Sequence, residues 1–284
     1  MIWQQYIHQH STEIASIFGE DEAIAILKRI AEHICATPYS ILKQTTLSDE
    51  DLREANVMLN ELKEGKPLQY VLGEAWFYKY PFKVNEAVLI PRPETEELIE
   101  WILSYMNKEI NTDKIPEILD IGTGSGCIPI TIKKEKPKTY ITSVDISREA
   151  LAMAEANTRQ LNTEIKFLEL DFLNESSWDS LNKYDIIVSN PPYIPINEKE
   201  TLSVSVRNHE PHQALFVPKN QPLLFYEKIA EFGKDHLYDS GVIFLELHQN
   251  YALRTKKLFE EFGYTEVELR KDISGNERML KVCK

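Results

Sequence analysis

The sequence is poor in cysteine, in long apolar runs and in positive charge, and each shortage excludes a class of protein. Its three cysteines, Cys35, Cys127 and Cys283, are scattered, and none belongs to a CxxC pair or to a Cys/His spacing typical of zinc ligands. We therefore expect no disulfide framework, no metal site and a reducing, cytoplasmic compartment. No stretch approaches the roughly 18 consecutive apolar residues that span a bilayer. Residues 1–14 lack both the basic start and the apolar block of a secretory signal.

The charge balance argues against a protein that grips nucleic acid. The 284 residues include 32 Lys and Arg against 45 Asp and Glu, which gives a formal net charge of −13. Proteins that bind long stretches of nucleic acid usually carry a basic surface, because neutralising phosphates supplies much of their affinity. Nucleic acid is therefore not expected as a substrate. The length corresponds to about two domains, and no feature points to an obligate oligomer, so a monomer is expected.

Residues 1–72 have the pattern of a small helical bundle. "EDEAIAILKRIAEHIC" repeats apolar positions at helical spacing, and no strand-like alternation interrupts the region. Ser48 and Asp51 have the spacing of a capping box before "LREANVMLNELKEG". Gly65 and Pro67 then end that helix.

Beyond residue 72 the pattern changes twice. Residues 73–90 are rich in aromatic and β-branched residues, which predicts a hairpin or an extended connector. Residues 91–284 begin with a helix at "PRPETEELIEWILSYM", and short apolar strands then alternate with helices. These strands are "EILDIG", "YITSVDI", "IKFLELD", "YDIIVSN" and "GVIFLELH". The pattern predicts an α/β fold with a doubly wound, mostly parallel sheet, and "YTEVELRKDISGNERMLKVCK" adds a C-terminal antiparallel hairpin at its edge, seven strands in all.

A glycine-rich loop follows the first of these strands. Gly122, Gly124 and Gly126 in "ILDIGTGSGCIPI" are spaced G-x-G-x-G, one residue short of the dinucleotide fingerprint, and the loop lacks the lysine of a P-loop. Glycine lets a ligand touch the backbone where a Cβ atom would clash. The loop therefore favours an uncharged or zwitterionic ligand over a phosphate, although a plain tight turn is the alternative.

The next two strand ends carry acids and an aromatic residue. Asp145 ends the second strand, about 20 residues after the glycine loop, where an acid can accept hydrogen bonds from ribose hydroxyls. Its alternative role is a helix N-cap, which Ser147 can fill equally well. Asp171 and Phe172 end the third strand, where they suit an adenine amine and a stacked purine, or else a capping acid beside a core phenylalanine. Parallel strand ends share one edge, which favours a nucleoside site.

The fourth strand ends in Asn190, Pro191, Pro192 and Tyr193. The prolines cannot continue a hydrogen-bonded ladder and keep the chain extended, so the Asn190 side-chain oxygen and a main-chain carbonyl can face the cleft as two rigid acceptors. Two acceptors match an NH2 group on a planar carbon, against which Tyr193 offers its ring. A proline-terminated strand end without function is the alternative.

In this order "DIGTGSG", "VDIS" and "NPPY" resemble the S-adenosylmethionine-dependent methyltransferases that modify amino groups of planar systems. Upstream, "PLQYVLGEAWFYKYPFKVNEAVLIPRPETEEL" resembles the release factor glutamine methyltransferases of the HemK or PrmC type, and the resemblance covers nearly the whole chain.

The resemblance implies a protein-(glutamine-N5) methyltransferase acting in translation termination on the Gly-Gly-Gln glutamine of peptide chain release factors. S-adenosylmethionine would be converted to S-adenosylhomocysteine without a metal, and residues 1–72 would help to dock the partner. Asn190, Pro191, Pro192 and Tyr193 would be catalytic and hold the amide. The resemblance also implies the cofactor contacts. The methionine part would lie against the loop residues Gly122, Thr123, Gly124, Ser125 and Gly126. Asp145 would hold the ribose, Asp171 and Phe172 would contact the adenine, and Asn190 would be a further cofactor contact.

Three other functions compete with this interpretation. An adenine-amine methyltransferase acting on DNA or RNA would use Asn190 and Tyr193 on a flipped base, but the acidic charge disfavours it. A catalytically silent binding protein would show an eroded glycine loop or a lost asparagine, and neither occurs. An NAD-dependent oxidoreductase is disfavoured by the glycine spacing.

Overall fold

The computed structural model describes residues 1–110 and 114–284, which form two compact units. One unit contains Met1–Glu74 together with Ser203–His209, and the other contains the remaining described residues. The segment Ser203–His209 thus lies in the first unit, although it comes from the middle of the region that the sequence assigns to the catalytic domain.

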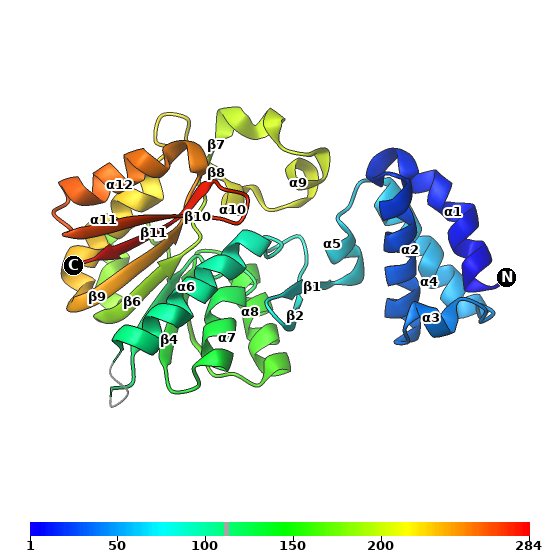
Figure 1. Ribbon diagram of the computed structural model, residues 1–284, viewed down its shortest axis with the longest axis horizontal. Coiled ribbons are helices and arrows are strands. Elements are labelled where there is room, and N and C mark those ends of the chain that lie inside the picture. The colour runs from blue at the N-terminus through cyan, green and yellow to red at the C-terminus, as the bar shows by residue number, and fades with distance from the viewer. Residues whose placement is uncertain (111–113) are drawn as a thin grey trace. The chain divides into compact units, whose positions relative to one another are not determined.

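The first unit consists of helices around an apolar core that includes Trp3 and Tyr6. Its helices are α1 (Trp3–Phe18), α2 (Glu20–Cys35), α3 (Tyr39–Leu42), α4 (Asp49–Lys63), α5 (Leu68–Leu72) and α9 (Val204–His209) (Figure 1). The predicted capping box is confirmed: Asp51 N donates to Ser48 Oγ at 3.0 Å, and Ser48 N donates to the Asp51 carboxylate at 2.9 Å. The helix ends just before Gly65, whose φ of +84° no other residue adopts easily.

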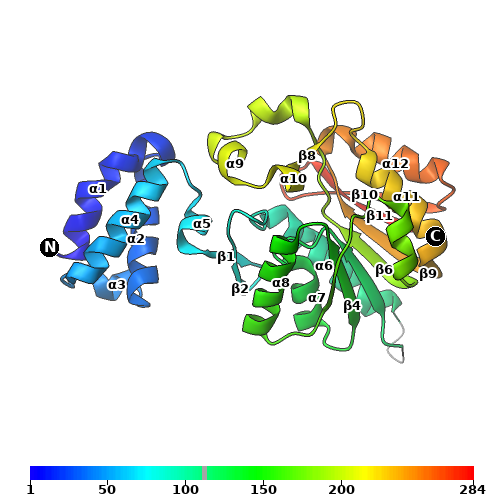
Figure 2. The ribbon, with the colours of Figure 1, turned by 180° about the vertical axis from the view of Figure 1, so that it is seen from behind.

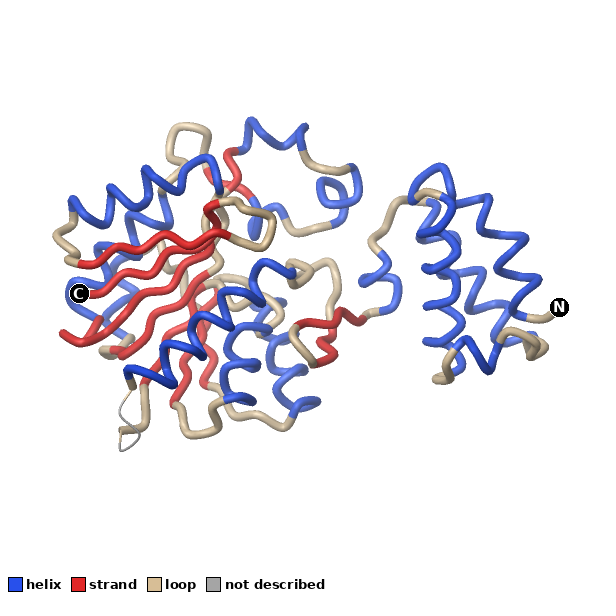
Figure 3. Tube along the Cα trace, viewed as in Figure 1, coloured by secondary structure: helices blue, strands red, loops and turns tan. Residues whose placement is uncertain are grey.

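A seven-stranded sheet forms the centre of the second unit (Figure 3), and its strand order is β10-β11-β9-β6-β3-β4-β5. The strands are β3 (Glu117–Ile121), β4 (Tyr140–Asp145), β5 (Lys166–Glu169), β6 (Tyr184–Ser189), β9 (Leu237–Glu246), β10 (Glu266–Lys271) and β11 (Glu277–Cys283). Neighbours from β9 to β5 pair in parallel, whereas β11 pairs antiparallel with β9 and β10. The predicted doubly wound sheet with a C-terminal hairpin is confirmed.

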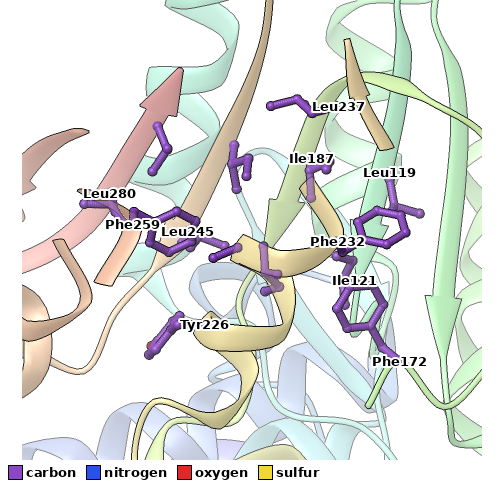
Figure 4. Close-up of a cluster of buried hydrophobic side chains, with 14 of the residues drawn as sticks. Leu119, Ile121, Phe172, Ile187, Tyr226, Phe232, Leu237, Leu245, Phe259 and Leu280 are labelled. Carbon is purple, nitrogen blue, oxygen red and sulfur yellow. The ribbon is translucent and has the colours of Figure 1, made fainter. Parts of the chain in front are cut away.

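Both faces of this sheet are covered, which explains why its strands lack a polar face. Ile118 and Ile186 pack with α6 (Pro93–Glu109), α7 (Cys127–Glu135) and α8 (Arg148–Leu161). Leu119 and Ile187, one position further along each strand, pack on the other face with α11 (Leu224–His236) and α12 (Ala252–Glu261) (Figures 2 and 4). Successive side chains of a strand point to opposite faces, so each strand contributes to both cores. Within residues 1–110 and 114–284, no helix combines the length and apolar character needed to cross a bilayer.

Short elements complete the second unit, apart from Glu74, which belongs to the first. They are the hairpin β1 (Glu74–Phe77) and β2 (Tyr80–Lys83), the pair β7 (Ile194–Pro195) and β8 (Phe216–Val217), helix α10 (His212–Leu215), and the 3-10 helices η1 (Glu175–Ser180), η2 (Ile196–Thr201) and η3 (Gln249–Tyr251). The ends of β3, β4, β5, β6 and β9 open on one edge of the sheet, where doubly wound folds bind their ligands.

Candidate active site

The glycine loop leaves β3 and enters α7 through three residues with positive φ. Gly122, Gly124 and Gly126 have φ angles of +77°, +55° and +79°. A Cβ atom at either of the first two would meet no heavy atom within 4 Å. At Gly126 it would lie 3.1 Å from the Cβ of Ala154 on α8. The first two glycines therefore leave space for a ligand, whereas Gly126 lets α7 pack closely on α8.

Asp145 connects this loop to the start of α8. Its Oδ2 accepts from Gly124 N at 2.9 Å and its Oδ1 accepts from Ser147 N at 2.9 Å. The N-cap of α8 is Ser147, whose Oγ accepts from Ala150 N. Burial raises the pKa of Asp145 above its usual value, although the backbone N–H groups of Gly124, Ser147 and Ile146 oppose that shift. The carboxylate thus stands at the rim of the loop with lone pairs left to accept further hydrogen bonds.

A cavity of about 380 Å³ lies over the loop, and ten of the predicted site residues line it. These ten are Gly122, Thr123, Gly124, Ser125, Asp145, Asp171, Phe172, Asn190, Pro191 and Pro192. Two predicted residues do not line it, namely Gly126 and Tyr193. The volume falls in the range of pockets that enclose a small organic ligand.

Asp171 and Phe172 differ in their surroundings. Asp171 is exposed and accepts from Leu173 N at 3.0 Å, in a local turn. Phe172 is buried in the core, where its ring lies 5.6 Å from that of Trp178 and 5.2 Å from that of Phe232 (Figure 4). The sequence offered two alternatives for Phe172, a core residue or a residue of the ligand site. Phe172 both packs in the core and lines the cavity.

Asn190 is held by residues that the sequence did not point to. Its Nδ2 donates to Thr95 Oγ1 at 3.2 Å, and Thr95 Oγ1 donates to Glu246 Oε2 at 2.6 Å. Tyr193 turns its hydroxyl away from the cavity and donates to Glu246 Oε1 at 3.1 Å. Tyr226 donates to the main-chain oxygen of Glu246 at 3.2 Å. Burial raises the pKa of Glu246 and also raises that of Tyr193.

A second unforeseen contact brings the segment after Glu210 over the cavity. Arg92, which lines the cavity, donates to Glu210 Oε1 at 2.6 Å, and the Glu210 side chain is only 1% exposed. Pro211, Gln213 and further residues up to Pro218 then line the same cavity. In the sequence, this contact is marked only by a charged residue beside proline in each segment, Arg92 in "PRPE" and Glu210 in "HEP". The two residues are 118 positions apart, so the sequence does not pair them.

Asp120 lies beneath the loop in an unusual state for an acid. It is fully buried near the end of β3. Burial raises its pKa to about 7, although the hydroxyls of Thr123 and Ser143 face its carboxylate and lower its pKa. Asp120 does not line the cavity. The open glycine loop and the free lone pairs of Asp145 fit S-adenosylmethionine.

Comparisons with known proteins agree with this geometry. Residues 100–208 match a family model described as "Methyltransferase small domain". The chain is 41% identical to a release factor glutamine methyltransferase of Flavobacterium psychrophilum, over 99% of both chains. It is 38% identical to one of Streptococcus pneumoniae, over 93% of this chain and 91% of the relative. Among solved structures, the hMettl16 catalytic domain in complex with MAT2A 3'UTR hairpin 6 has the same fold, with a TM-score of 0.54 and 15% identity over 83% of this chain and 81% of that chain.

Proposed function

This chain belongs to the family of release factor glutamine methyltransferases, and from this premise we propose how its site carries out the reaction. The enzyme transfers a methyl group to the side-chain amide nitrogen of the glutamine in the Gly-Gly-Gln motif of peptide chain release factors. Relatives at 35–41% identity over most of the chain carry this name. They do not favour the alternative of an adenine-amine methyltransferase.

The cavity over the glycine loop is the proposed binding site of S-adenosylmethionine. Residues 122–126 would hold its methionine part, Asp145 would accept hydrogen bonds from its ribose hydroxyls, and Asp171 and Phe172 would contact its adenine. The space at Gly122 and Gly124 and the lining of the cavity support this assignment. S-adenosylmethionine supplies a methyl group on a positively charged sulfur, which keeps the bonding electrons when a nitrogen displaces it.

Asn190 to Tyr193 form the proposed site for the glutamine amide. An amide nitrogen is a weak nucleophile because its lone pair is delocalised into the carbonyl. Asn190 Oδ1 and the main-chain oxygen of Pro191 each accept one of its two N–H hydrogens, which orients the lone pair toward the methyl group. Pro192 keeps this segment extended, and Tyr193 anchors it through the hydrogen bond of its hydroxyl to Glu246. The N–C bond forms as the S–C bond breaks, and the methylated amide, which is then cationic and strongly acidic, releases one N–H proton to water. Positioning and fixed dipoles therefore supply the catalysis without a strong base.

The observation that carries this proposal is the place of Asn190, which lines the cavity with its Nδ2 already bound to Thr95. The first test is mass spectrometry of purified release factor after incubation with the enzyme and S-adenosylmethionine. We expect a gain of one methyl group on the Gly-Gly-Gln glutamine. Asn190→Ala should lose this methylation and keep cofactor binding. A fully active Asn190→Ala enzyme would show that the amide is bound elsewhere.

The first unit is the proposed docking surface for the release factor. A helical unit with its own core can offer a rigid face to a protein partner without disturbing the sheet. Deleting residues 1–72 should weaken release-factor binding and leave S-adenosylhomocysteine binding unchanged. Equal binding of the release factor by the shortened enzyme would contradict this role.

A further inference from the structure

The direction of the Asn190 amide decides what the site can bind. An asparagine side chain ends in a carbonyl oxygen, which only accepts hydrogen bonds, and an NH2 group, which only donates. If the oxygen faces the cavity, the site accepts from the NH2 group of a glutamine. If the amide is turned over, the site presents a donor, which suits the carboxylate of a glutamate instead. The two side chains have nearly the same shape, so shape alone separates them poorly.

With Glu246 ionised, the hydrogen bonds of Thr95 set the direction of the Asn190 amide. A threonine hydroxyl has one hydrogen, and Thr95 Oγ1 lies 2.6 Å from Glu246 Oε2, to which it donates. The same oxygen can then only accept from Asn190, whose Nδ2 lies 3.2 Å away. The NH2 group of Asn190 is thereby used on Thr95, and Oδ1 is left for the cavity that Asn190 lines. Thr95 and Glu246 are 2% and 1% exposed, so solvent does not compete for these groups.

Neither residue is explained by local structure. A threonine hydroxyl caps a helix from the N-cap position, whereas Thr95 is the third residue of α6. The N-cap of α6 is instead Arg92, without a side-chain cap, and the Thr95 hydroxyl reaches a residue 151 positions away. Glu246 ends the buried strand β9, whose preceding residues Gly241 to Leu245 are all buried, and both of its carboxylate oxygens accept hydrogen bonds. Burying an acid at this position costs free energy that its hydrogen bonds must offset.

We propose that Thr95 and Glu246 are positioning residues that fix the Asn190 amide with its oxygen in the cavity, so that the site selects a glutamine side chain and rejects a glutamate. A glutamate carboxylate would meet two acceptors, Asn190 Oδ1 and the Pro191 carbonyl, and no donor from either. The inference rests on the proposed function, since it assigns the glutamine amide to this site. Rejecting an analogue by leaving polar groups unpaired is an effective form of discrimination.

The test measures binding of two full-length release factors to the enzyme loaded with S-adenosylhomocysteine: one with the native Gly-Gly-Gln motif, and one with its glutamine replaced by glutamate. We expect the wild-type enzyme to prefer glutamine by at least roughly 30-fold. Thr95→Val keeps the shape and removes the hydroxyl, so the amide can turn over. We expect this preference to fall about tenfold or more, with kcat for methylation reduced by about 10- to 100-fold. Thr95→Ser restores the hydroxyl and should stay within about threefold of wild type.

Two further variants separate positioning from a loss of stability. Thr255→Val removes another buried hydroxyl, one that donates to Tyr251 O at 3.0 Å on α12, and should leave the preference unchanged. Glu246→Gln can donate to Thr95, which permits the reversed direction, so its preference should also fall.

If Thr95→Val and Glu246→Gln both prefer glutamine over glutamate as strongly as the wild-type enzyme does, the inference is overturned and the proposed function stands. If the wild-type enzyme methylates no release factor glutamine, the proposed function fails and the inference fails with it, and that result is visible before any variant is made.

Discussion

The side-chain amide of Asn157 donates to the main-chain oxygen of Ser125 at 2.8 Å and so ties helix α8 to the glycine loop. The same Nδ2 donates to Lys83 O at 3.0 Å, while Oδ1 accepts from Lys83 N at 2.7 Å. Asn157 is fully buried, so these three bonds are not exchanged with water. Asn157 thus fixes the position of the glycine loop, over which the cofactor is proposed to bind, although Asn157 itself does not line the cavity.

Asn157→Ala should loosen the loop and destabilise the second unit. It leaves the Lys83 N–H and the Ser125 carbonyl without partners, which costs about 2–4 kcal/mol in the free energy of unfolding. We expect S-adenosylhomocysteine to bind about tenfold more weakly, as measured by isothermal titration calorimetry. Gln160→Ala removes an exposed hydrogen bond to Pro81 O from the same helix and serves as the control. Equal cofactor affinity in both variants would contradict the role of Asn157.

Two glycines of the loop should respond differently to alanine. Gly122→Ala places a Cβ in open space at positive φ, which costs about 1–2 kcal/mol of stability, and the methyl group intrudes where the cofactor is proposed to bind. Gly126→Ala adds a clash with Ala154 to the same strain, at a further cost of about 1–3 kcal/mol. Thermal unfolding and cofactor titration should therefore show the larger stability loss for Gly126→Ala and the larger direct affinity loss for Gly122→Ala. The opposite ranking would refute these assignments.

Asp120 should make the ligand-free enzyme less stable as the pH rises. Its folded pKa of about 7 lies above its usual value of 3.8, so between these pH values the unfolded chain has released a proton that the folded chain keeps. Stability therefore falls with rising pH over this window, by up to roughly 4 kcal/mol from this residue alone. Asp120→Asn should raise the melting temperature at pH 8 and change it little at pH 5. Asp179→Asn, at an exposed position, is the control and should change neither value.

Arg92 should contribute to stability through the buried carboxylate of Glu210. Arg92→Met leaves that carboxylate without its cation, and because Arg92 is itself partly exposed we expect a loss of about 2–4 kcal/mol. Lys256→Met breaks an exposed pair with Glu260 and should cost less than about 1 kcal/mol. Urea titration gives both values. Similar losses of unfolding free energy in the two variants would mean that the buried pair of Arg92 and Glu210 stabilises the protein no more than an exposed pair does.

The sequence predicted those parts of the molecule that local patterns encode. The capping box at Ser48 depends on neighbours three residues apart, and the sheet follows from the length and spacing of its apolar runs. Asn190 and the glycine loop could be placed at one edge because parallel strands share a carboxyl end. The expected absence of a metal, the monomeric state and the cytoplasmic location stay predictions.

The network around Asn190 could not be found in this way. Thr95 and Glu246 are ordinary residues in their own segments, one in the first turn of a helix and one at the end of a strand, and only the packing of α6 beside β9 brings them together. Tyr193 was expected to offer its ring to the substrate, but its hydroxyl binds Glu246 and it does not line the cavity. The direction of a side chain depends on partners that are distant in sequence, and a single sequence does not record them.

The contact between Thr95 and Glu246 also bears on how the enzyme is made. Glu246 arrives on β9, which is the last of the parallel strands to be synthesised, after the glycine loop and Asn190 have already left the ribosome. A nascent chain that stops before β9 can pair β3, β4, β5 and β6, yet it lacks the group that takes the hydrogen of Thr95. On the proposed role of Thr95 and Glu246, the substrate amide site is completed only when β9, the final parallel strand, docks late in translation.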